Sequence, residues 1–103
     1  TLGWRQLSFD VYQTELKEGI RIFFIVREEF FDRPSIYGTN KGEYFDNAER
    51  YIFFNKAVLA FVERNQEKWD VFHCHDWQAA LLPVYLKTYY FGHPTLGLIK
   101  TVL

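Results

Sequence analysis

The chain has 103 residues, about the length of one domain, and its 49% hydrophobic content excludes an intrinsically disordered segment. Twelve basic residues against thirteen acidic ones give a net charge of -1, so the chain lacks the positive excess typical of nucleic-acid binding. The longest apolar run, residues 79–86, is too short to cross a bilayer, and the single Cys excludes an internal disulfide, as is usual in the cytoplasm. We therefore expect a cytoplasmic protein with neither a membrane nor a nucleic-acid partner.

Two strands are predicted in the first quarter of the chain. Residues 4–16 alternate loosely between polar and apolar side chains, and the turn at 17–19 separates them from the apolar run 20–26, which predicts a hairpin-like pair. Because 20–26 is apolar on both faces, we expect it to be a buried central strand of a parallel or mixed sheet. Proline and glycine then break the pattern, which predicts a long loop over 27–44.

A helix is predicted to begin at Asp46 and to run to about Asn65. Asp46 and Glu49 have the spacing of a capping box, in which each side chain bonds a free amide of the first helical turn. Apolar residues at three- and four-residue spacing predict the buried stripe of this helix, which consists of Tyr51, Phe54, Val58, Phe61 and Val62.

The second half of the chain alternates strand and helix. The pattern predicts a strand over 69–75, a helix with little polar surface over 77–90, and a buried strand over 97–103. Pro83 lacks an amide donor, so we expect the middle helix to be kinked or to begin late. Alternation of this kind predicts an α/β fold.

The densest group of functional side chains, His73–Gln78, follows the predicted strand 69–75. Ligand sites of α/β proteins lie at the carboxyl ends of strands. Strand alternation places His73 and His75 on one face and Cys74 on the other, and it puts Asp76 at the helix N-cap. One interpretation is purely structural, with Asp76 capping the helix and both His residues hydrogen-bonded.

A metal site is the second interpretation of this group, since His-x-His followed by Asp begins the pattern of zinc and di-metal hydrolases. The continuation differs, because Asp76 follows His75 immediately, Trp77 comes next, and His93 is the only other His. We therefore expect neither a metal site nor a cofactor. Cys74 is a poor candidate nucleophile, because it lies in a predicted strand without an activating neighbour.

Three sequence blocks resemble segments of bacterial glycogen and starch synthases, in the same order and spacing. WDVFHCHDWQAALLPVYLK, residues 69–87, is similar to the family's His-x-His-Asp-Trp-(Gln/His) segment. FFDRPSIYG, residues 30–38, resembles its Tyr-Asp-Arg-Pro loop, and YFDNAERYIFFNKAVL, residues 44–59, resembles the opening of its following helix. The resemblance extends over residues 19–103. It implies an enzyme that lengthens α-1,4-glucan.

The family resemblance also implies a fold with two Rossmann-like domains that face each other across a cleft, the B-type glycosyltransferase architecture. Residues 1–103 would then be a part of the N-terminal, acceptor-side domain, truncated at both ends and separated from the C-terminal domain that holds the nucleotide. The whole enzyme would transfer glucose from ADP-glucose, or from UDP-glucose, to the non-reducing end of the glucan with retention of configuration. The isolated chain is expected to be inactive.

Carried over by position, the resemblance implies one catalytic residue, Asp76. It also implies that the substrate is contacted by Tyr37, His75, Trp77 and Gln78. The residue types suit a sugar, because carboxylates and phenols hydrogen-bond hydroxyl groups and an aromatic face packs on a pyranose ring.

Two arginines of the matched blocks, Arg33 and Arg50, are expected to hold the loop and the helix in place through charge-assisted hydrogen bonds. The alternatives to a glucan synthase are a non-catalytic carbohydrate-binding or structural half-domain and, further from the pattern, a metal-dependent hydrolase.

Overall fold

The computed structural model describes residues 6–65 and 67–103, with the mixed helix and strand content that the sequence predicted for an α/β protein. The chain divides into two compact units, residues 1–50 and 51–103, and the boundary falls within helix α2 (Asn47–Asn65). In the part of the chain that is described, no helix combines the length and the apolar character needed to cross a membrane.

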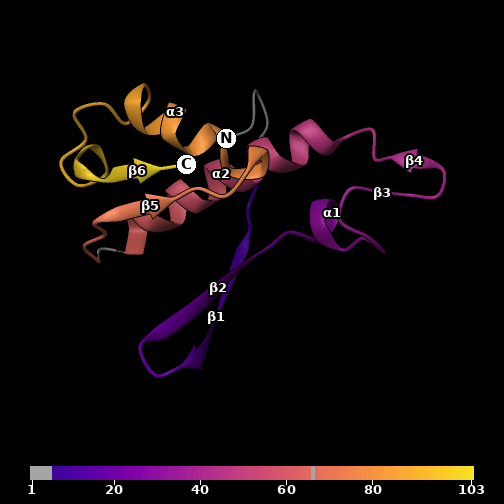
Figure 1. Cartoon of the computed structure of the whole chain (residues 1–103), viewed down its shortest axis with the longest axis horizontal. Helices are drawn as coiled ribbons and strands as arrows, with labels where there is room; N and C mark the ends of the chain where they lie inside the picture. Colours follow the sequence, from indigo (N-terminus) through magenta and orange to yellow (C-terminus); the bar gives the residue numbers. More distant parts are fainter. Residues whose placement is uncertain (1–5, 66) are drawn as a thin grey trace. The chain divides into compact units, whose positions relative to one another are not determined.

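The described residues of unit 1 form two antiparallel hairpins, one short helix and the start of α2. The first hairpin pairs β1 (Asp10–Lys17) with β2 (Ile20–Val26), which lie side by side in Figure 1. Helix α1 (Glu28–Phe31) follows, and β3 (Gly38–Thr39) then pairs with β4 (Gly42–Glu43). The predicted hairpin is confirmed, but its first strand begins at Asp10 and is shorter than the predicted 4–16, of which residues 4 and 5 lie outside the described residues. The segment 27–44 is not one long loop, because α1 and the second hairpin lie within it.

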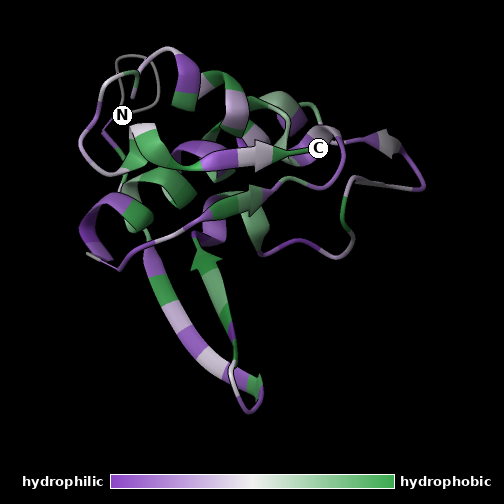
Figure 2. Ribbon diagram, turned by 60° about the vertical axis from the view of Figure 1, so that its left-hand side comes forward, coloured by the Kyte–Doolittle hydropathy of each residue, from purple (hydrophilic) through white to green (hydrophobic). Residues whose placement is uncertain are grey.

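The prediction that residues 20–26 form a buried central strand is wrong. Among the described residues β2 pairs with β1 alone, and Ile20 and Phe24 are 43% and 52% exposed. Figure 2 shows hydrophobic and hydrophilic residues alternating along β1, whereas β2 is hydrophobic over most of its length. An apolar strand can be buried on both faces, but the number of its neighbours is a long-range property that its own sequence does not specify.

Unit 2 is built around a short strand–helix–strand sequence. Its strands β5 (Val71–His73) and β6 (Lys100–Val102) are parallel neighbours, with helix α3 (Leu81–Lys87) between them in the chain (Figure 1). Two short 3-10 helices, Trp77–Ala79 and Leu96–Leu98, precede α3 and β6. A crossover between parallel strands is the repeating unit of α/β folds.

The fully buried cluster of unit 2 joins α2, the residue after β5, α3 and the second 3-10 helix: Leu59, Val62, Cys74, Leu82, Leu86 and Leu96. Of the stripe predicted for α2, only Val62 is fully buried, and the other four residues are half-buried. Several buried residues of α2 lie off that stripe, including Phe53, Ala57 and Leu59. Apolar residues occur almost all round this helix, so periodicity alone did not identify its most buried face.

The prediction for Pro83 is confirmed in its second form, a late helix start. Helix α3 begins at Leu81, which puts Pro83 in the first turn, where an amide has no acceptor within the helix.

The predicted strand 97–103 is shorter than expected and is not buried, since β6 covers Lys100–Val102 and only its middle residue is half-buried.

Candidate functional site

The candidate site begins where β5 ends. The Cys74 amide donates to the Val102 carbonyl at 2.7 Å, so the pairing with β6 continues past β5, and the Cys74 side chain is buried. His73 and His75 are exposed, and their ring centroids are 4.1 Å apart. The predicted alternation, with the two His residues opposite Cys74, is confirmed.

Neither the thiol nor the His pair supports the alternative chemistries. Burial raises the pKa of the Cys74 thiol, which disfavours the thiolate that a nucleophile requires. Among the residues that the structure describes, no three His, Cys, Asp or Glu side chains are grouped so that they could hold a metal ion. The hydrolase interpretation therefore finds no third ligand for the His pair in this part of the chain.

Asp76 has an unusual backbone conformation, with φ 62° and ψ -170°. It is the one non-glycine residue with positive φ in the described chain. A residue held in such a region costs about 1–3 kcal/mol, and such residues cluster at functional sites. Its carboxylate accepts a hydrogen bond from the Trp77 amide at 2.7 Å, so the predicted N-cap is confirmed, although it caps the 3-10 helix Trp77–Ala79 and not a long helix.

The Asp76 turn, residues 75–78, contacts α2 through Trp77 and Gln78. The Trp77 ring meets the Tyr51 ring edge to face, with centroids 5.1 Å apart, and it remains 52% exposed. The Gln78 carbonyl accepts a hydrogen bond from Asn55 Nδ2 at 2.7 Å. The turn thus exposes a carboxylate and part of an aromatic ring on consecutive residues, while α2 bonds the backbone at Gln78.

Asn55 was missed by the sequence analysis, and Tyr51 was interpreted only as a core residue. A signal for Asn55 was present, because a polar residue of poor helix propensity stands in the middle of the apolar helix segment 51–62. The sequence of residues 51–62 does not show that Asn55 bonds Gln78, which is distant in the chain.

Tyr37 lies in unit 1, whereas the other four predicted site residues lie in unit 2. It directly precedes β3 and is 41% exposed. Its carbonyl accepts hydrogen bonds from the Tyr44 amide and from Asn47 Nδ2, both at 2.9 Å. The backbone at Tyr37 is therefore fixed to Tyr44, directly after β4, and to the start of α2 within its own unit.

Arg33 joins the loop block to the helix block, as the sequence analysis expected. Both oxygens of the Asp46 carboxylate accept from its guanidinium, at 3.0 and 2.8 Å, and the Glu29 carbonyl accepts at 2.6 Å. The hydrogen bond from Arg33 is the main reason that the pKa of Asp46 is lowered. The capping-box interpretation of Asp46 did not include this partner.

The Asp46 ion pair predicts a pH-dependent stability. A carboxylate whose folded pKa lies below its unfolded value near 3.8 stabilises the fold above that value, and the contribution is lost as the pH falls through the folded pKa. In a protein carrying this segment, Asp46→Asn should therefore lower the free energy of unfolding at neutral pH, with the deficit shrinking below about pH 4. Urea denaturation at several pH values measures the deficit, and one that does not change with pH would contradict the assignment. Asp32→Asn, an exposed carboxylate of the same loop, is the matched control.

Arg50 is a buried residue of α2 that bonds the loop containing Arg33. It is 3% exposed, and its guanidinium donates to the carbonyls of Phe30 at 2.6 Å and Ile36 at 2.8 Å and to Asn47 Oδ1 at 2.7 Å. It also lies over the Tyr44 ring, 5.1 Å from the centroid. The expected role of Arg50 in fixing loop and helix is confirmed.

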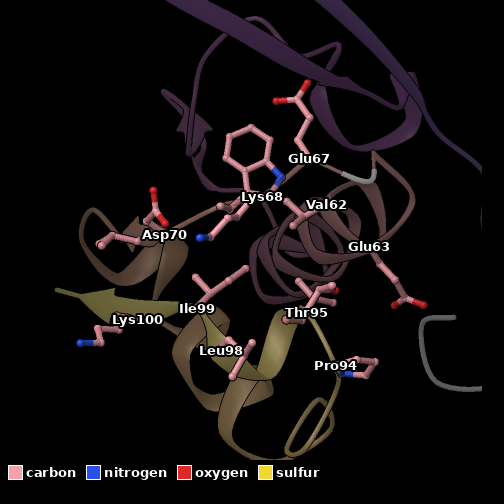
Figure 3. A pocket seen from close by; sticks show the side chains of 13 residues that line it. Val62, Glu63, Glu67, Lys68, Asp70, Pro94, Thr95, Leu98, Ile99 and Lys100 are labelled. Atoms are coloured by element: carbon pink, nitrogen blue, oxygen red, sulfur yellow. The ribbon is translucent and has the colours of Figure 1, made fainter.

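A separate cavity of about 680 Å³ lies at the other end of the strands of unit 2 (Figure 3). It is lined mainly by residues of the segments 67–71 and 94–100, which precede or begin β5 and β6, together with Val62 and Glu63 of α2. None of the predicted site residues lines it. The site predicted at the carboxyl end of β5 is thus a surface turn and not this cavity.

Comparison with known proteins gives the family. A family model described as the starch synthase catalytic domain matches residues 1–103. The chain belongs to the starch synthase catalytic domain family. The resemblance found in the three sequence blocks is thereby confirmed.

Curated relatives of this starch synthase family chain include three bacterial glycogen synthases. That of Thermodesulfovibrio yellowstonii is 52% identical over 82 residues, which are 80% of this chain and 16% of the relative. That of Elusimicrobium minutum is 54% identical over 71 residues, 69% of this chain and 15% of the relative. That of Opitutus terrae is 45% identical over 86 residues, 84% of this chain and 18% of the relative. The chain therefore spans less than a fifth of the length of these relatives, and no solved structure matches it.

Proposed function

We propose that this chain is part of the N-terminal, acceptor-side domain of a glucan-synthesising glycosyltransferase with two Rossmann-like domains. Residues 1–103 would contribute one wall of the cleft, and the C-terminal domain would hold the nucleotide-sugar donor. The parallel β5–α3–β6 arrangement supports a Rossmann-like domain, because such domains are built from repeated strand–helix–strand units. The relatives' printed names, glycogen synthase, support the reaction class.

The observation that carries the proposal is the Asp76 turn. The His-x-His-Asp-Trp-Gln motif forms an exposed turn at the carboxyl end of a parallel strand, with a strained Asp76 and a half-exposed Trp77. In α/β proteins this end of the strands is where ligands bind. Backbone strain of this kind persists only where the surroundings hold it, which favours a functional turn over a simple cap.

Each residue of the site would have a positioning role toward the sugar. The carboxylate of Asp76 would accept hydrogen bonds from hydroxyls of the transferred glucose or of the acceptor end, and the Trp77 ring would pack on a pyranose face. His75, Gln78 and Tyr37 would add hydrogen bonds to sugar hydroxyls.

In the proposed reaction the bond between glucose C1 and the donor diphosphate breaks, and a bond to O4 of the non-reducing end forms with retention of configuration. The departing nucleotide diphosphate takes up the proton of the acceptor hydroxyl.

ADP-glucose is the proposed donor and UDP-glucose the alternative, and the proposed location is the cytoplasm. Groups that stabilise the departing diphosphate supply much of the rate in such transfers, and these groups would belong to the C-terminal domain.

The proposal is tested with the full-length protein that carries this segment. Incubated with glycogen and labelled ADP-glucose or UDP-glucose, it should incorporate glucose into polymer, whereas the 103-residue chain alone should give no incorporation above background. Failure of the full-length protein with both donors would favour the non-catalytic, carbohydrate-binding or structural alternative. Incorporation by the isolated chain would show that the donor site does not require the rest of the protein.

A further inference from the structure

Asn55 is a buried amide in the middle of α2 that bonds the Asp76 turn. Its side chain is 1% exposed, and its Nδ2 donates to the Tyr51 carbonyl and to the Gln78 carbonyl, both at 2.7 Å. Both hydrogens of the amide are therefore used. One bond stays within the helix, and the other crosses to the turn.

Asn55 is locally unfavourable in this position. Asn is a poorer helix former than Ala or Leu by about half a kcal/mol, and burying an amide is unfavourable unless its polar atoms are bonded. Within the described residues, the Oδ1 atom of Asn55 is buried without a hydrogen-bond partner. An apolar residue here would avoid both penalties, so the side chain must gain something outside the helix, and the bond to Gln78 is the contact that the structure offers.

Tyr51 lies one helical turn before Asn55, on the same face of α2. Its ring meets Trp77, and Asn55 meets the next residue of the turn, Gln78. Two adjacent residues of the turn are thus held by two residues of one helix face, directly after the strained Asp76. Strain at Asp76 needs surroundings that prevent the turn from relaxing, and this pair of contacts provides them.

We infer that Asn55, assisted by Tyr51, is a positioning residue that sets the orientation of Asp76 and Trp77 toward the sugar. The inference rests on the proposed function. Neither side chain is assigned to contact the substrate. Loss of the contact should let the turn relax away from its reactive geometry, and because small misplacements of reacting groups cost large factors in rate, the effect should fall on turnover.

The test compares Asn55→Leu with Val62→Ala in the full-length enzyme. Asn55→Leu removes both hydrogen bonds of the amide while keeping a branched side chain. Val62→Ala weakens the buried cluster of unit 2 two turns further along the same helix, beside the cavity of Figure 3. We expect Asn55→Leu to lower kcat about tenfold while changing the KM for glycogen less than about threefold, and Val62→Ala to keep kcat within about twofold of wild type. Melting temperatures measured in parallel show whether the two variants are similarly stable. A kcat within about twofold of wild type for Asn55→Leu would overturn the inference.

A second pair keeps the inference testable if Asn55→Leu does not fold. Tyr51→Phe retains the ring that meets Trp77, and Tyr51→Leu removes it. We expect kcat to stay near wild type in the first variant and to fall several-fold in the second, and equal kcat values would overturn the inference.

The two proposals fail in different ways. If the wild-type enzyme transfers glucose and the kcat values of Asn55→Leu and Tyr51→Leu equal that of the wild type, only the positioning role is overturned. Wild-type enzyme without transfer overturns the proposed function and the positioning role with it.

Discussion

Replacing Asp76 with Asn in the full-length enzyme should lower turnover by about one to three orders of magnitude while leaving the melting temperature close to that of the wild type. Asn caps a helix about as well as Asp and has nearly the same size and shape, so the turn should keep its conformation. What Asn cannot reproduce is the negative charge and the full acceptor capacity that the carboxylate would offer to sugar hydroxyls. The effect should therefore appear in kcat and not in stability.

Two controls separate the chemical role of Asp76 from its structural one. Asp70→Asn removes an exposed carboxylate just before β5, at the opposite end of the strand, and should leave turnover near wild type. Asp76→Ala loses the cap, so it should lower the free energy of unfolding by about 1–2 kcal/mol. Unchanged turnover in Asp76→Asn would reduce this residue to a structural cap.

Replacing Arg50 with Met should destabilise the domain by about 3–5 kcal/mol, the largest stability effect that we expect, because each buried acceptor that loses its donor costs about 1–3 kcal/mol. Met keeps an apolar stem in the buried position but removes every donor. The buried carbonyl of Phe30 and the partly buried carbonyl of Ile36 would then lose an arginine donor, and the start of α2 would lose its bond to the loop. Urea denaturation of the full-length protein, compared with wild type, measures the effect.

Arg50→Lys and Arg64→Met complete that experiment. A lysine ammonium has no planar fork and cannot serve both carbonyls in the same geometry, so Arg50→Lys should still lose about 1–3 kcal/mol. Arg64 is an exposed arginine near the end of the same helix, and Arg64→Met should change stability little. A loss below about 1 kcal/mol for Arg50→Met would show that the bonds of Arg50 are not needed to hold this region.

The parts of the fold predicted correctly are those that depend on neighbouring residues. The turn at 17–19 predicted the hairpin, and the spacing after Asp46 predicted a helix that ends at Asn65. The late start of α3 followed from the missing amide of Pro83. Such signals are local, because hydrogen bonds within a helix or across a tight turn join residues that are close in the chain.

The parts predicted wrongly depend on distant segments. The apolar sequence of β2 favoured burial, but Phe24 is half-exposed because β1 is the only strand that pairs with β2 in the described chain. The segment 97–103 was likewise predicted to be a buried strand, but β6 is short and mostly exposed. Burial depends on which elements pack nearby, and the apolar character of a segment gives only its capacity for burial.

The sequence by itself determined the family, through three ordered motif blocks, and the residue types of the candidate site, His75 to Gln78. It also determined that Asp76 would stand between a strand and a helical turn. Only the tertiary structure decided that Asp76 is strained and that Asn55 and Gln78, far apart in the chain, are joined by a hydrogen bond. Motifs and caps are short-range patterns in the sequence, whereas a backbone angle held by packing and a bond between two elements exist only once those elements meet.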